Sequence, residues 1–91
     1  MTLCDRRNLN KISALLFHNR DSIEENVHRQ LTITMRAMYE SPDFASSLEC
    51  YKRMQGLLND AERDKKLPAH FHSHIMRYVY VGLGVRSGAK P

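Results

Sequence analysis

Apolar residues recur three and four positions apart along most of this chain, the spacing that places them on one side of an α-helix. Four segments show the pattern, over about residues 6–18, 23–40, 42–65 and 69–82. The apolar positions that define them are Leu9, Ile12, Leu15, Leu16 and Phe17; Ile23, Val27, Leu31, Met35 and Met38; Phe44, Leu48, Tyr51, Met54 or Gln55, Leu58 and Ala61; Phe71, Ile75, Tyr78 or Val79, and Gly82. The pattern predicts an all-α protein, a compact small bundle of about four helices.

Residues that typically begin or end helices separate these segments. Asp5 is the expected N-cap of the first helix, and Asn19 can adopt the left-handed conformation that ends one. Ser22 with a glutamate three residues later matches a capping box for the second helix. Ser41 and Pro42 fit the N-cap and first position of the third helix. Each cap predicts the point at which its helix begins or ends.

The fourth segment leaves a strand as the alternative to a helix. Residues 77–81 are β-branched or aromatic at most positions, but residues 1–4 are the only plausible pairing partner, so a helix over about 69–82 is favoured. We expect a single helical domain over 1–85 and a flexible C-terminal tail over 86–91. Gly56 weakens the third helix locally and would permit a close helix crossing there.

Three histidines in the fourth segment raise the question of a metal site. His70, His72 and His74 would share one face of a strand, whereas on a helix His70 and His74 share a face and His72 points away. A third ligand would then have to come from His18, His28 or an acid of the second helix, and no catalytic glutamate accompanies the pair. The sequence therefore predicts no metal site.

The other reactive residue types do not form a recognisable catalytic set. Gly82 and Gly84 lack the following helix and further glycine of a dinucleotide-binding loop, so we expect them to end the last helix. Cys4 and Cys50 lie far apart in the sequence without a local nucleophile signature, and Cys50 is expected to be partly buried. We predict a protein that is not an enzyme and has no cofactor. The default location is cytoplasmic, because the chain shows no signal peptide or membrane-spanning run.

Charge is distributed unevenly along the chain, whose formal net charge is +4. The net charge is +3 over residues 1–20, −4 over 21–49, +2 over 50–66, and +3 over 67–91, where there is no acid. Such a distribution argues against a uniformly basic surface that coats nucleic acid. This charge distribution fits a protein that presents an acidic surface to one partner and basic ends to another.

Methionine and tyrosine content points to protein interaction. The stripe methionines Met35, Met38 and Met54 are expected in the core, while Met76 and Tyr80 lie off the stripe and are better interface candidates. The predicted partner-binding residues are Arg29, Arg36, His70, His74, Met76, Arg77 and Tyr80. The alternative is a small helical DNA-binding regulator, although no helix carries the dense row of Arg, Lys, Asn or Gln expected of a recognition helix.

The span SALLFHNRDSIEENVHRQLTITMRAMYESPDF and its continuation LLNDAERDKKLPAHFHSHIMRYVYVGLGVRSG resemble the small orphan proteins of enterobacterial prophages and phage satellites. The resemblance is greatest to the redirecting-phage-packaging proteins of satellite islands. It covers most of the chain through overall character rather than a defined motif, so no site residue is carried over. It implies a helical protein that binds the helper phage's small terminase subunit, so that satellite DNA is packaged. DNA would then be contacted through that partner, and self-association stays open.

Overall fold

Residues 6–84 are the part of the chain that the computed structural model describes, and they form four α-helices joined by short connections. The elements are α1 (Arg6–His18), the short 3-10 helix η1 (Arg20–Ser22), α2 (Glu25–Tyr39), α3 (Phe44–Arg63) and α4 (Phe71–Leu83). The all-α prediction is confirmed, and the strand alternative for residues 77–81 is wrong. The expectations for the Asp5 cap, Cys4, residues 1–4 as a strand and the tail at 86–91 concern positions outside the described residues.

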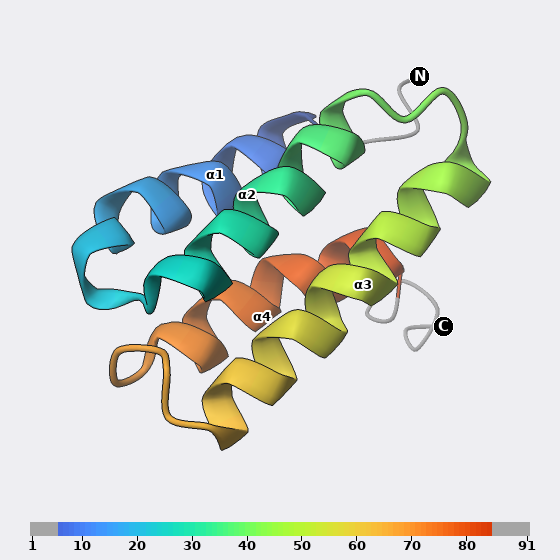
Figure 1. The fold of residues 1–91 in the computed structure, drawn as a ribbon. Coiled ribbons are helices and arrows are strands. Elements are labelled where there is room, and N and C mark those ends of the chain that lie inside the picture. Colours follow the sequence, from blue (N-terminus) through green and yellow to red (C-terminus); the bar gives the residue numbers. More distant parts are fainter. Residues whose placement is uncertain (1–5, 85–91) are drawn as a thin grey trace.

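Successive helices run in opposite directions, so the chain passes up and down the bundle (Figure 1). Each helix packs against the helix that follows it, and α4 returns to pack against α1. The four helices therefore form a closed ring of neighbours, with α2 and α4 at opposite corners. This arrangement decides which predicted surface residues can act together.

The predicted apolar stripes meet inside this ring. The residues that are fully or almost fully buried are Leu9, Ile12, Leu16, Ile23, Leu31, Met35, Met38, Tyr51, Met54, Leu58, Ala61, Phe71, Ile75, Met76 and Val79. The three stripe methionines are in the core, as predicted, and Cys50 is half-buried against it. Two predicted stripe positions are wrong, because Phe17 is 64% exposed and Phe44 is 53% exposed.

Helix α2 begins two residues later than the capping box predicts. Ser22 lies in η1, and Ile23 is extended, with its side chain buried in the core. Glu24 is the N-cap instead, and its carboxylate accepts a hydrogen bond from the Val27 N–H at 2.8 Å. Asn19 is not left-handed at the end of α1, since its φ is −107°.

Helix α3 begins at Phe44 because Asp43, not Ser41, is its N-cap. The Asp43 carboxylate accepts a hydrogen bond from the Ser46 N–H at 2.8 Å. That hydrogen bond, together with one from the Ser46 side chain, holds the pKa of Asp43 below its ordinary value. Ser41 instead donates its hydroxyl to the Ala37 carbonyl at 2.9 Å, at the end of α2.

We expect Asp43→Ala to lower the melting temperature near neutral pH, because the Ser46 N–H then loses its acceptor. The pKa of Asp43 is lower in the folded than in the unfolded chain, so its stabilisation is complete above the unfolded value and is lost as pH falls through the folded value. Thermal unfolding by circular dichroism at several pH values measures this. A melting-temperature difference between wild type and variant that stays constant down to pH about 2 would contradict the assignment.

Helix α4 ends as the glycines predict, although only one of them acts at the end. Gly84 has a φ of +77° and closes the helix through its N–H, whereas Gly82 lies inside α4. Gly82 faces the ring of Tyr51 on α3 so closely that an added Cβ would overlap it. The close crossing predicted at Gly56 is wrong, because nothing lies within 4 Å of a Cβ built there.

Candidate interaction surfaces

The outer side of α4 presents most of the partner-binding residues predicted from the sequence. His70, His74, Arg77 and Tyr80 are exposed there. Met76 is only 3% exposed, so its prediction as an interface residue is wrong. Met76 instead belongs to the buried side of α4, where it packs into the core with Ile75 and Val79.

The other two predicted residues, Arg29 and Arg36, lie exposed on α2. Because α2 and α4 occupy opposite corners of the bundle, the predicted set belongs to two surfaces rather than one. Arg29 also forms an i,i+4 ion pair with Glu25, at 3.6 Å between side-chain atoms. Both side chains are largely exposed, so the pair contributes little to stability and leaves Arg29 accessible to a partner.

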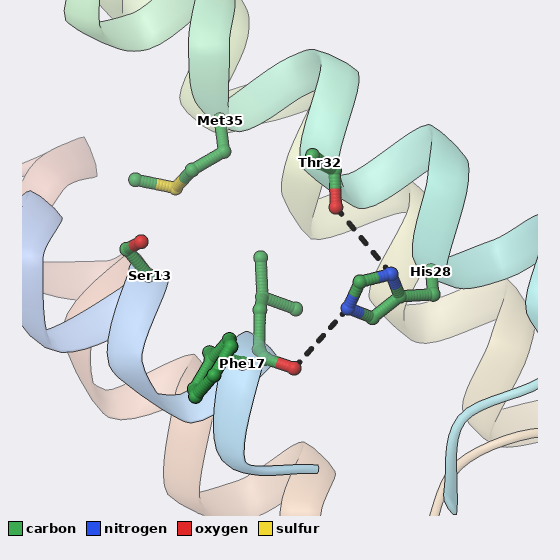
Figure 2. Close-up of a pocket in the computed structure, with 6 residues that line it drawn as sticks. Ser13, Phe17, His28, Thr32 and Met35 are labelled. Atoms are coloured by element: carbon green, nitrogen blue, oxygen red, sulfur yellow. Dashed lines mark hydrogen bonds between the residues drawn. The ribbon is translucent and has the colours of Figure 1, made fainter. Parts of the chain in front are cut away.

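A groove between α1 and α2 was not predicted from the sequence (Figure 2). It has a volume of about 180 Å³ and a mostly apolar lining: Ser13, Leu16, Phe17, His28, Thr32 and Met35. Phe17 stands at its rim with an exposed ring. A signal for this exposure was present in the sequence: Phe17 shares its side of α1 with Ser13 and Asn10, which are polar.

Hydrogen bonds hold the His28 ring at the edge of this groove (Figure 2). Its Nε2 lies 3.2 Å from the Leu16 carbonyl oxygen, and its Nδ1 lies 3.5 Å from the Thr32 hydroxyl. A carbonyl oxygen can only accept, so Nε2 donates to Leu16, while Nδ1 lies within reach of the Thr32 hydroxyl. His28 therefore links the end of α1 to α2 and fixes one wall of the groove.

Phe17 and Thr32 line this groove, and Arg29, Ile33 and Arg36 are exposed on the same helix as Thr32. We call these five residues together the α2 face: Phe17, Arg29, Thr32, Ile33 and Arg36. Ile33 is 55% exposed and lies four residues after Arg29 and three before Arg36, so the three share one side of α2. Aromatic and arginine residues beside exposed aliphatic surface are typical of protein–protein interfaces. The α2 face thus has the composition of a protein-binding surface.

The three histidines His70, His72 and His74 do not share one face, as expected for a helix. His72 is half-buried with its Nε2 2.7 Å from the Asn59 side-chain oxygen, while His74 lies against the Tyr78 ring, 6.2 Å between ring centres. His70 precedes the helix in a left-handed conformation, with φ of +66°. Within residues 6–84, no group of three His, Cys, Asp or Glu side chains could hold a metal ion.

No protein-family model, curated protein or solved structure matches this chain. None of the helices in the described residues has the length and apolar character needed to cross a membrane.

Proposed function

We propose that this protein is a non-enzymatic interaction module of a mobile genetic element, and that the α2 face binds a phage protein. One observation carries the proposal: the Phe17 ring is exposed beside an apolar groove, although the other large apolar side chains of α1 pack in or against the core. The resemblance described above supports the small terminase subunit as the partner and the packaging of satellite DNA as the outcome.

The energetics of the α2 face favour a protein partner. Phe17 and Ile33 lie on helices whose opposite sides are buried in the core. Little backbone conformational entropy therefore remains to be lost on binding. Burying a Phe or Ile side chain that was exposed contributes about 1.5–3 kcal/mol. Two such anchors flanked by arginines, which tolerate desolvation better than lysines, suit the centre of an interface.

Replacing the two apolar anchors tests this proposal. Phe17→Ser and Ile33→Ser should each weaken binding to a purified small terminase subunit at least about tenfold, the equivalent of ~1.4 kcal/mol. Light-scattering chromatography reports the mass of the complex, and titration calorimetry reports its affinity. Both residues are exposed, so far-UV circular dichroism should show unchanged helix content.

Phe44→Ser is the matched control, because Phe44 is a comparably exposed apolar residue at the start of α3, outside the α2 face. It should bind like wild type. Equal losses for all three variants would mean that general surface hydrophobicity drives binding, and would contradict the proposed site.

A further inference from the structure

Acidic residues are absent from two neighbouring helices of the bundle. Neither α1 nor α4 contains an aspartate or glutamate, and these two helices pack side by side. The acids of the described residues lie on α2, α3 and the connections: Asp21, Glu24, Glu25, Glu40, Asp43, Glu49, Asp60, Glu62 and Asp64. The fold thus brings two helices without acidic residues, from opposite ends of the described residues, to lie side by side.

The hydrogen bond from Asn8 Nδ2 to the Tyr78 carbonyl, at 2.9 Å, fixes how α1 and α4 align. It places the first half of α1 beside the second half of α4. We define the α1–α4 face by exposed cationic, histidine and hydroxyl side chains of α1, of α4 and of the residue before α4: Arg7, Lys11, His70, Ser73, His74, Arg77 and Tyr80. Every one of these groups can donate a hydrogen bond, and none is a carboxylate.

The α1–α4 face differs from the α2 face in its apolar content. The three most exposed large apolar side chains of the described residues, Phe17, Ile33 and Phe44, are not part of it, whereas the less exposed Tyr80 and Val81 lie on α4. A surface with many donors and cations but few apolar anchors suits phosphate oxygens better than a protein partner.

We propose that the α1–α4 face binds the sugar–phosphate backbone of duplex DNA without reading its sequence. Duplex DNA carries about one negative charge per 1.7 Å of its axis. This high density of negative charge matches the cationic side chains of the α1–α4 face. A single strand would need aromatic stacking platforms, and Tyr80 is the one exposed aromatic residue that α4 supplies. Reading bases would need several Arg, Asn or Gln side chains, whereas α4 has only Arg77.

This contact is independent of the proposed protein partner, because the two surfaces lie on different sides of the bundle. Helices α2 and α4 are not neighbours in the ring, so a protein on the α2 face leaves the outer side of α4 open. The protein could then hold a phage protein and DNA together. Loss of DNA binding and loss of protein binding can therefore be measured separately.

Fluorescence anisotropy of a labelled duplex of about 20 base pairs and arbitrary sequence tests the proposal, with tag-free protein and a series of salt concentrations. About three phosphate contacts predict a slope of log K against log salt near −3. The double variant Lys11→Glu with Arg77→Glu should bind at least about tenfold more weakly at low salt, with a slope closer to zero by about 2.

The control is Lys52→Glu with Arg53→Glu, which makes the same change of net charge at exposed positions of α3. It should stay within about threefold of wild type if the α1–α4 face is the site. The proposal is overturned if both double variants lose affinity equally, if wild type shows no salt-dependent binding, or if single-stranded DNA of the same length binds more tightly. Unchanged helix content by circular dichroism confirms that the variants fold.

Discussion

Gly82→Ala is expected to lower the free energy of unfolding by about 1–3 kcal/mol, the usual cost of forcing extra atoms into a packed core. The added Cβ would overlap the Tyr51 ring, which is buried between α3 and α4. The ring cannot move away freely, because its hydroxyl accepts a hydrogen bond from Asn8 Nδ2 at 3.1 Å. The expected destabilisation runs against helix propensity, which favours alanine over glycine by about 0.8–1.0 kcal/mol.

Gly56→Ala is the matched control within the same protein. Gly56 also lies inside a helix, but an added Cβ there meets open space, so propensity alone should act. We expect its free energy of unfolding to rise by about 0.5–1 kcal/mol. Equilibrium urea unfolding of both variants measures the two changes. A stabilised Gly82→Ala, or the same sign at both positions, would contradict the close contact between α3 and α4.

Asn8→Asp is expected to lower the free energy of unfolding by at least about 2 kcal/mol at neutral pH, because a buried charge replaces an amide donor. Asn8 is only 6% exposed, and its Nδ2 donates to both the Tyr51 hydroxyl and the Tyr78 carbonyl. An ionised carboxylate can accept from a reoriented Tyr51 hydroxyl, but it repels the Tyr78 carbonyl. The Asn8 side chain thereby links α1 to both α3 and α4, and removing its donors weakens both links.

The pH dependence identifies the buried charge as the cause. Burial raises the pKa of the introduced carboxyl above its unfolded value, so the penalty is complete above the folded pKa and disappears as pH falls below the unfolded value of about 3.9. Urea unfolding between pH 4 and 8, relative to wild type, should show this recovery on acidification. Asn8→Ala should lose about 1–3 kcal/mol with no such dependence. Identical pH profiles for the two variants would exclude a buried carboxylate at this position.

The hydrophobic period predicts the four helices of this protein and the full extent of α1, residues 6–18. It does not predict the first residues of α2, α3 and α4, each of which begins about two residues later than the pattern indicates. For α2 the sequence predicts Ser22 as the cap, whereas the N-cap is Glu24. The choice depends on Ile23, which is extended and buried against residues distant in sequence. A local pattern contains no information about that burial.

Exposure at the edge of an apolar stripe depends on what packs against that edge in the folded protein. Phe17 and Met76 each lie one position beyond a clear stripe residue, Leu16 and Ile75, yet Phe17 is exposed and Met76 is buried. Phe17 lies at the open groove between α1 and α2, whereas Met76 packs into the core cluster. The glycines show the same limit, because the close approach at Gly82 depends on Tyr51, 31 positions away in the sequence.

The candidate surfaces were predictable only in part, for a similar reason. The sequence shows that residues 67–91 lack acids and that residues 1–20 are basic, but only the packing of α1 against α4 joins them into one face. The same packing separates Arg29 and Arg36 from the α4 residues with which they were grouped. The groove beside Phe17 has no counterpart in the periodicity, because it depends on how α1 and α2 meet.

The measurement that tests the central claim most directly is a nuclear magnetic resonance titration of isotope-labelled protein with an unlabelled small terminase subunit. At 10.6 kDa the free protein is small enough for every backbone amide to be followed. The α2 face predicts that the largest changes in shift or intensity fall on Phe17, Thr32, Ile33 and Arg36, while the outer residues of α4 change little. Changes confined to α4, or no change at any amide, would contradict the account.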